Sequence, residues 1–238
     1  WVDVALLPVE MDRINADGYL AVVIDVLRAT TTIVTALANG AARVIPIATV
    51  EAARSRHAKE PNSLLCGERG AHPLPGFDLG NSPREYTKER IEGKGLILTT
   101  TNGTRAMEAT RRAGAKTTVI GALTNRQAVV DFCSESEDPL LFVCAGCHGG
   151  FSLEDALCAG AFIAGLEGEL HLTDAAQVCL ALFNHWGHDE LALQIGLSEH
   201  GQRLKRKGYG EDIKLAMEID RFSVIPVYQD GEIRLMEA

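Results

Sequence analysis

Residues 96–109 read LILTTTNGTRAMEA and join an apolar strand pattern to a helix pattern within one short stretch. Leu96 to Leu98 are apolar, the threonines that follow have high β-propensity, and RAMEA is composed of good helix formers. Between them lies TTTNGT, a turn in which almost every residue is small and can form hydrogen bonds. Taken alone, this turn is equally consistent with a strand end, a tight turn and a helix N-cap. Its number of hydrogen-bonding groups raises the question of a bound ligand.

The same alternation of apolar runs and helical segments extends in both directions from this stretch. Strands are expected at Val2–Leu7, Leu20–Val26, Arg43–Ile47, Leu64–Cys66, Gly95–Thr100, Thr117–Ile120 and Leu140–Cys144. Helices are expected at Ala29–Asn39, Val50–Lys59, Thr104–Ala113, Asn125–Ser134 and Leu153–Leu166. Nearly continuous apolar strands that alternate with helices predict an α/β fold in three layers, α/β/α, with a mainly parallel sheet that is covered on both faces.

The C-terminal section has a different character. Four segments have helical patterns, at Thr173–Trp186, Glu190–Ile195, Glu199–Lys207 and Glu211–Ile219. SVIPVYQDGEIRLME then predicts a β-hairpin with its turn at Asp230-Gly231, and Pro226 favours an edge or irregular strand. We expect one domain over residues 1–238, in which residues 1–168 form the sheet core and residues 169–238 pack on it. The glycine- and proline-rich segment 67–90 is long enough to be functional or disordered, and its Phe77, Leu79 and Tyr86 favour order.

Composition excludes several classes of protein. The net charge is −9, from 23 Lys and Arg against 32 Asp and Glu, which argues against a nucleic-acid-binding protein. No apolar run approaches the length of a membrane span, and the first residues lack the pattern of a signal peptide. The six cysteines lie mostly in apolar surroundings, so we expect free thiols and a cytoplasmic location. Cys144 and Cys147 form a single CxxC, which lacks the second pair of a zinc ribbon.

Four predicted strand ends are followed by polar turns. They are DVLRAT at Asp25, GERG at Glu68, TNGTR at Asn102, and AGCHGGFSLEDA, which contains His148. Because ligands of parallel sheets bind beyond the carboxyl ends of the strands, we expect these turns to share one site. Each also has an ordinary explanation: helix caps, acids in a first helical turn, and surface ion pairs of arginines. Their coincidence favours a common function.

The residue types in these turns predict metal-assisted phosphoryl chemistry. Helix N-termini and glycine-flanked N–H groups favour oxyanions, and arginines add bidentate contacts. Carboxylates beside an anion site repel the ligand unless a divalent cation lies between them, and oxygen ligands suit Mg²⁺. The sequence contains no P-loop, no GxGxxG in the first strand-to-helix turn and no GxSxG elbow.

Four stretches in this order resemble the 2-phosphosulfolactate phosphatases, the phosphatases of coenzyme M biosynthesis and their bacterial relatives. The stretches are VIDVLRATTTIVTAL, GERG with GFDLGNSPREY, TTTNGTRA, and AGCHGGFSLEDALCAGA, which together span residues 20–161. The resemblance implies an α/β/α fold and a Mg²⁺-dependent phosphatase that converts 2-phospho-3-sulfolactate to 3-sulfolactate and phosphate. Where the family often has two glycines after GER, this chain has Gly70-Ala71-His72, so this loop is expected to differ in shape.

Candidate residues follow from the turns and from the matching motifs. Catalytic candidates are Asp25, Arg28, Glu68, Arg69 and Asp78, of which Asp25 or Asp78 would activate the attacking water. Candidates for phosphate or substrate binding are Asn81, Thr101, Asn102, Gly103, Thr104, Gly146, His148 and Gly149. Candidate Mg²⁺ ligands are a subset of Asp25, Glu68, Glu154 and Asp155. Arg28 and Arg69 are expected to cover the remaining charge of the substrate.

Other functions stay open at this point. The substrate is a small anionic phosphorylated acid in this interpretation, and it could be a phosphorylated hydroxy acid other than phosphosulfolactate. A non-catalytic module that binds a phosphorylated metabolite would keep the anion-binding turns but would have no use for the acids. A nucleotide-dependent transferase is the third alternative. A homodimer is expected only because small α/β enzymes often form dimers.

Overall fold

The fold was analysed in a computed structural model, which describes residues 1–236. The strands are β1 (Val2–Ala5), β2 (Leu20–Ile24), β3 (Arg43–Pro46), β4 (Leu64–Arg69), β5 (His72–Pro73), β6 (Gly95–Thr99), β7 (Thr117–Gly121), β8 (Leu140–Cys144), β9 (Pro226–Gln229) and β10 (Glu232–Leu235). The helices are α1 (Ala29–Ala38), α2 (Val50–Lys59), α3 (Lys88–Ile91), α4 (Gly103–Arg112), α5 (Arg126–Ser134), α6 (Leu153–Gly165), α7 (Asp174–Leu197), α8 (Glu199–Arg206) and α9 (Gly210–Ala216). Short 3₁₀ helices lie at Pro8–Asp12, Pro83–Glu85 and Leu123–Asn125.

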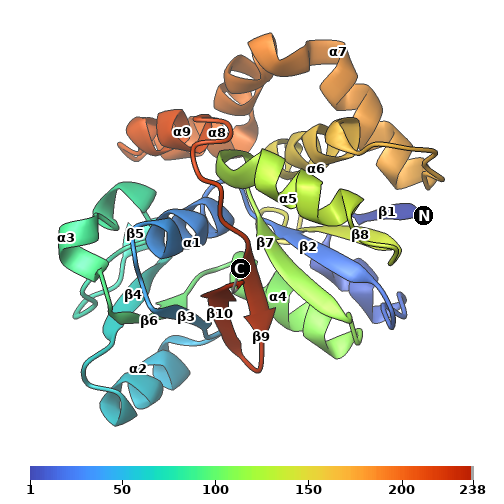
Figure 1. The fold of residues 1–238 in the computed structure, drawn as a ribbon. Helices are drawn as coiled ribbons and strands as arrows, with labels where there is room; N and C mark the ends of the chain where they lie inside the picture. Colours follow the sequence, from blue (N-terminus) through green and yellow to red (C-terminus); the bar gives the residue numbers. More distant parts are fainter. Residues whose placement is uncertain (237–238) are drawn as a thin grey trace.

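The predicted α/β fold is confirmed, but the sheet is mixed. Its strand order is β1-β8-β2-β7-β9-β10-β3-β6-β4-β5. The strands β1, β8, β2 and β7 form one parallel group, and β3, β6 and β4 form another. The hairpin β9–β10 lies between the two groups and pairs antiparallel with both (Figure 1).

Of the two alternatives that Pro226 suggests, an edge strand or an irregular strand, the edge position is therefore wrong. Asp230 and Gly231 have φ of 52° and 80°, as the predicted tight turn requires. Pro226 is the first residue of β9, a position that tolerates the missing N–H. The hairpin pairs with its outer neighbours only through Val119–Val227 and Ile233–Val44. The pairing is thus irregular, as Pro226 indicates, although the hairpin is central.

Both faces of the sheet are covered, as the apolar strands predict. Along β2, Val22 and Ile24 belong to a cluster with Phe162 of α6, whereas Val23 belongs to a cluster on the opposite face with Ile33 of α1. This alternation is the period of a strand that is buried on both sides. A smaller cluster lies between α2 and the strands β3, β4 and β6.

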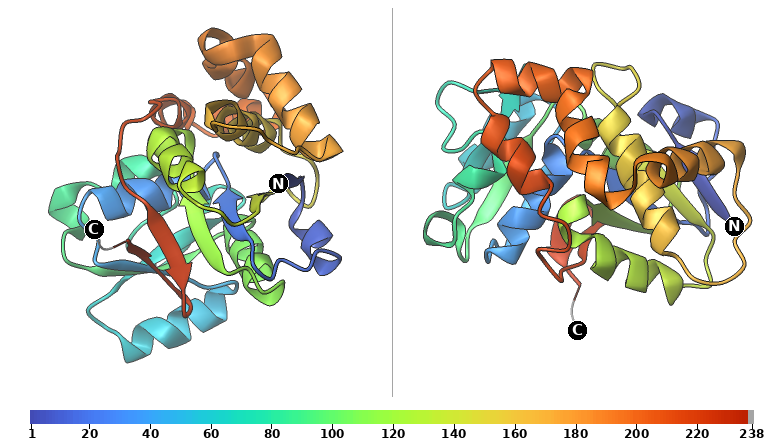
Figure 2. Two further views of the ribbon diagram at one scale, coloured as in Figure 1. Left: turned by 45° about the vertical axis from the view of Figure 1, so that its right-hand side comes forward. Right: turned by 90° about the horizontal axis from the view of Figure 1, so that it is seen from above.

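Among the C-terminal helices, α7 packs on the outer side of α6, whereas α8 and α9 lie level with α6 (Figure 1). Seen from above, α7, α8 and α9 lie side by side across the molecule (Figure 2). The helix α7 consists of two helical segments that meet at Gly187, where φ is 62° and ψ is −173°, which is not helical backbone. The two predicted segments at Thr173–Trp186 and Glu190–Ile195 lie on either side of this break. No helix in residues 1–236 is long and apolar enough to cross a membrane. All six cysteines are free thiols, as expected.

The segment 67–90 is ordered. Leu79 and Tyr86 are buried in the same cluster as Ile33, and the Tyr86 hydroxyl donates to the carbonyl of Gly80 at 2.7 Å. Residues 77–79 run beside β4, where the N–H of Asp78 donates to Leu65 at 2.8 Å. The apolar residues of this segment thus fasten it to the sheet.

Candidate functional site

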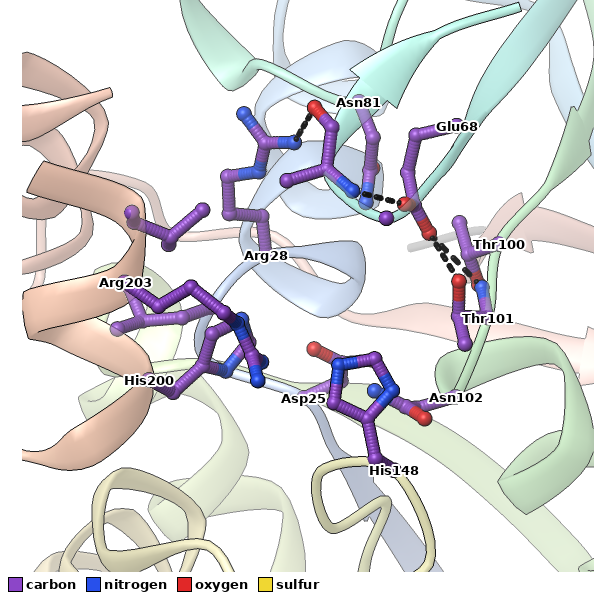
Figure 3. Close-up of a pocket in the computed structure, with 14 residues that line it drawn as sticks. Asp25, Arg28, Glu68, Asn81, Thr100, Thr101, Asn102, His148, His200 and Arg203 are labelled. Atoms are coloured by element: carbon purple, nitrogen blue, oxygen red, sulfur yellow. Dashed lines mark hydrogen bonds between the residues drawn. The ribbon is translucent and has the colours of Figure 1, made fainter. Parts of the chain in front are cut away.

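A pocket brings the four predicted turns together with one helix that the sequence analysis did not include. Its side chains come from the ends of β2, β4, β6 and β8, from the loop at Asn81 and from α8 (Figure 3). The lining residues are Asp25, Leu27, Arg28, Glu68, Gly70, Ala71, Asn81, Thr100, Thr101, Asn102, His148, His200, Arg203 and Leu204.

The four turns were expected to meet because the carboxyl ends of the strands in one parallel sheet share an edge. The observed sheet does not bring them together in this way. Three antiparallel pairings separate β7 from β3, so the two parallel groups run in opposite directions. The helices connect the groups, because α4 follows β6 of one group but packs on β2 of the other. At the junction, a Cβ on Gly103 would lie 2.6 Å from Cβ of Ala29 and 3.0 Å from Oδ2 of Asp25. A glycine at residue 103 therefore allows the α4 turn to approach Asp25.

Many hydrogen-bonding groups of the TTTNGT turn are used within the protein. Thr101 donates both its N–H and its hydroxyl to Oε1 of Glu68, at 2.9 and 2.8 Å. Thr104 bonds back to Thr100 through its N–H and its hydroxyl. The N–H groups of Asn102 and Gly103 donate to no acceptor within residues 1–236, and the side chain of the N-cap residue Asn102 forms no capping hydrogen bond. The two backbone N–H groups and the side-chain amide of Asn102 are therefore the donors of this turn that can bind an anion.

Asp25 is a buried carboxylate that faces the pocket (Figure 3). Its Oδ1 accepts the N–H of Ala29 at 3.2 Å, whereas Oδ2 accepts no hydrogen bond from the described residues. Burial raises the pKa of Asp25 to about 6, because the opposing effects of His200 and Ala29 are smaller and the charges of Glu68 and Glu154 also raise it. A bound cation would relieve this unfavourable charge.

The other three predicted metal ligands have partners in the protein. Glu68 accepts from Thr101 through Oε1 and from the N–H of Ala71 through Oε2, at 2.7 Å. Asp155 accepts the N–H groups of Val26 and Gly146 at 2.9 and 3.1 Å, so it links two turns of the site. Glu154 bonds His200. No group of three or more His, Cys, Asp or Glu side chains is arranged to hold a metal within the described part of the chain.

Arg28 lines the pocket, but its guanidinium already forms an ion pair and a hydrogen bond within the protein. Its Nη1 lies 2.7 Å from Oδ2 of Asp212 in α9, and its Nη2 donates to the carbonyl of Ala71 at 2.9 Å. The ring of Tyr209 stacks 4.2 Å from the guanidinium carbon, and Ser82 donates to the other oxygen of Asp212 at 2.7 Å. The expected contact of Arg28 with a substrate's charge is therefore limited to its remaining donors.

Several predicted residues lie outside the pocket lining. Because β4 continues through Arg69, the side chains of Glu68 and Arg69 point to opposite faces. Arg69 donates to Ala48 and Thr99, and Asp78 is an exposed residue that accepts the N–H of Leu65 at 2.8 Å. The structure also leaves Gly103, Thr104, Gly146, Gly149, Glu154 and Asp155 out of the lining, although Gly103 lies against Asp25 and Glu154 bonds His200, both of which are lining residues. The predicted residues that do line the pocket are Asp25, Arg28, Glu68, Asn81, Thr101, Asn102 and His148.

His200 and Arg203 of α8 also line the pocket, although neither is among the residues predicted from the sequence. Nδ1 of His200 lies 2.8 Å from Oε1 of Glu154. Burial opposes the charge of His200, but hydrogen bonds to Cys147 and Glu154 outweigh it and raise its pKa to about 10. Arg203 donates from Nη2 to Sγ of Cys147 at 2.6 Å. These cations lie on the α8 side of the pocket, opposite Thr101 and Asn102 (Figure 3).

His148, on the glycine-rich turn after β8, lines the same pocket as Asp25 and Asn102 (Figure 3). Its φ of 53° places it in the left-handed region that a glycine would ordinarily occupy. Partial burial lowers its pKa, and the charges of Arg203 and His200 lower it further. The imidazole is therefore neutral at pH 7 and can accept or donate a hydrogen bond.

A family model described as 2-phosphosulpholactate phosphatase matches residues 6–231. The chain belongs to this family. A protein of Symbiobacterium thermophilum is 43% identical over 225 residues, which cover 92% of this chain and 95% of the relative. A Clostridium perfringens protein is 38% identical over 244 residues, covering 100% and 97%, and a Synechococcus protein is 45% identical over 213 residues, covering 87% of each. All three relatives are named probable 2-phosphosulfolactate phosphatase. The family match thus includes the turns that line the pocket and also α8.

Proposed function

We propose that this protein is a Mg²⁺-dependent phosphatase of a small phosphorylated acid, with 2-phosphosulfolactate as the first candidate. One observation carries the proposal: the carboxylate of Asp25 lies beside the N-terminus of α4, where Asn102 and Gly103 have unused N–H groups. An anion site and an acid side by side suit phosphoryl transfer better than simple anion binding. The names of the relatives support the choice of substrate.

The phosphoryl group would bind at the α4 turn. The N–H groups of Asn102 and Gly103 and the positive end of the α4 dipole would hold its oxygens. Glu68 holds the turn in place through Thr101 and holds the following loop through Ala71. In this proposal, Glu68 is therefore a positioning residue.

Asp25 is the protein ligand we propose for Mg²⁺, through Oδ2, the oxygen that accepts no hydrogen bond from the described residues. Mg²⁺ commonly uses one or two carboxylates together with phosphate oxygens and water, so a single carboxylate fits this ion. When bound, the ion would neutralise negative charge on the phosphoryl oxygens. Asp25 would then keep its ionised form despite its burial.

His148 is the residue we propose to orient the attacking water. It lines the pocket together with Asp25 and Asn102, and its neutral imidazole can accept a hydrogen bond from water (Figure 3). Asp78, the other carboxylate considered for this role, lies outside the pocket lining. Because the transition state of phosphoryl transfer spreads charge over its oxygens, positioning and charge stabilisation contribute most of the rate.

The deciding experiment measures phosphate release from 2-phosphosulfolactate, 2-phospholactate and phosphoglycerate, with Mg²⁺ and with EDTA. We expect release from at least one of these esters, abolished by EDTA and restored by added Mg²⁺. Asp25→Asn should lower kcat/KM by about 100-fold or more, because it removes the proposed metal ligand. Asp189→Asn, at an exposed position of α7, is the matched control and should retain the wild-type rate.

The alternatives give different results in the same assay. Tight binding of these acids without any phosphate release would show a non-catalytic binding module. Phosphate release that is unchanged in EDTA would show that the activity does not need Mg²⁺. A normal rate for Asp25→Asn would show that Asp25 is not the metal ligand. A preference for 2-phospholactate or phosphoglycerate would replace the candidate substrate.

A further inference from the structure

Arg203 is a cation at the pocket that has no carboxylate partner. The ion pairs of residues 1–236 do not include it, and its guanidinium is held by a donation to Sγ of Cys147 at 2.6 Å. Arg28, by contrast, is neutralised by Asp212 at 2.7 Å, and both residues are almost fully buried. Arg203 is thus the arginine of the pocket lining that no carboxylate of the described residues neutralises, so its charge is available to an anionic ligand.

His200 adds a second cation on the same face of α8. It precedes Arg203 by one helical turn, and both side chains line the pocket together with the buried Leu204. Glu154 fixes the His200 ring through Nδ1 at 2.8 Å. These contacts hold the two cations in place before any ligand binds.

The position of this pair separates it from the proposed phosphate site. Thr101 and Asn102 lie on one side of the pocket, His200 and Arg203 lie on the other, and Asp25 lies between them (Figure 3). A phosphoryl group at the α4 turn therefore leaves the α8 cations available to another part of the same ligand. A pocket with anion-binding groups on two sides suits a ligand with two separate anionic groups.

We propose that Arg203, assisted by His200, binds a second acid group of the substrate, a carboxylate or a sulfonate, and so selects phosphate esters that carry one. This inference rests on the proposed function for the placement of the phosphoryl group. Arg203 is the specificity residue, and Glu154 and Cys147 are positioning residues that act through His200 and Arg203.

The test compares binding of inorganic phosphate with binding of 3-sulfolactate and lactate, measured by calorimetry on the whole protein. We expect Arg203→Gln to weaken 3-sulfolactate binding by about 10- to 100-fold, because a charge-assisted hydrogen bond is lost. Binding of inorganic phosphate should change by no more than about twofold. Sulfolactate carries both acid groups and lactate only the carboxylate, so the two ligands show which group Arg203 contacts.

Two variants control for general effects. Arg206→Gln removes an exposed arginine of the same helix and should leave both affinities unchanged. Arg203→Lys keeps the charge without the planar fork and should retain part of the sulfolactate affinity. Melting temperatures of all variants establish that each one is folded.

Two outcomes would overturn the assignment. Equal weakening of phosphate and sulfolactate by Arg203→Gln would place Arg203 at the phosphate, and no weakening of either would remove it from the site. Because the readout is binding, it decides the role of Arg203 even if the protein releases no phosphate from any ester. Failure of the proposed phosphatase activity and failure of this inference are thus separate results.

Discussion

Arg28 and Asp212 are 184 residues apart in the chain and form an ion pair with 2.7 Å between Nη1 and Oδ2. The exposed fractions of the two side chains are 3% and 2%. The pair joins the first turn of the pocket to α9, and Ser82 and Ala71 complete the hydrogen bonds around it. Removing one partner would leave a buried charge without compensation.

Asp212→Ala should therefore lower the free energy of unfolding by about 3–5 kcal/mol. The measurement is urea denaturation at pH 7, with Glu211→Gln as the control, because Glu211 lies next to Asp212 but forms only an exposed pair with Lys214. The control should stay within about 0.5 kcal/mol of the wild type. An Asp212→Ala protein as stable as the wild type would show that Arg28 finds another partner.

Asp25 should destabilise the folded protein when it is ionised. Its folded-state pKa of about 6 lies above the ordinary value of 3.8. The penalty is absent below pH 3.8, grows as the pH rises toward 6 and is complete above it. Metal-free Asp25→Asn should consequently match the wild type near pH 4 and exceed it at pH 7, by up to about 3 kcal/mol. A stability difference that does not change between these pH values would show that Asp25 titrates normally.

Gly103→Ala should damage both stability and ligand binding. The added Cβ would lie 2.6 Å from Cβ of Ala29, so α4 or α1 has to move. We expect a loss of about 1–3 kcal/mol in unfolding free energy, together with weaker binding of inorganic phosphate. Gly210→Ala is a suitable control, because its Cβ would be 3.9 Å from the nearest atom, in Lys205. Normal phosphate binding by Gly103→Ala would contradict the need for this close approach.

His200 should stabilise the protein at neutral pH and lose this effect in alkali. Its folded-state pKa of about 10 lies above the ordinary 6.5, so the contribution is complete below pH 6.5 and disappears as the pH rises through about 10. The stability difference between wild type and His200→Gln should therefore be larger at pH 6 than at pH 10. The measurement is the melting temperature, in which a difference of about 1 kcal/mol in unfolding free energy corresponds to about 2–4 °C for a chain of this size. A difference that grows with pH would mean that His200 is neutral in the folded protein.

Most helices and strands could be predicted from the sequence pattern. Three of the four predicted turns also line the pocket, as expected. The turns at Asp25, Asn102 and His148 follow apolar strands, and their polar residues reach the pocket. The prediction for GERG was partly wrong, because these residues belong to β4, which continues to Arg69. Side chains alternate along a strand, so Arg69 points to the face opposite Glu68. One additional strand residue thus decides which charge faces the pocket.

The cations of α8 could not be predicted from local pattern. His200 and Arg203 belong to an ordinary amphipathic helix, and their partners Glu154 and Cys147 lie about 50 residues earlier in the chain. Their spacing by one turn, next to the buried Leu204, was the available signal. Spacing alone does not distinguish a cation at a pocket from one in solvent, since the difference depends on how α8 packs on the sheet.

The central position of the β9–β10 hairpin has a consequence for synthesis. All other strands leave the ribosome first, yet the sheet is continuous only through this last pair. Until residues 226–235 are made, β7 and β3 are open edges, the kind of surface that pairs with other chains. Completion of the sheet thus waits for residues 226–235, so a product that ends before them would present two unfinished halves to chaperones and proteases.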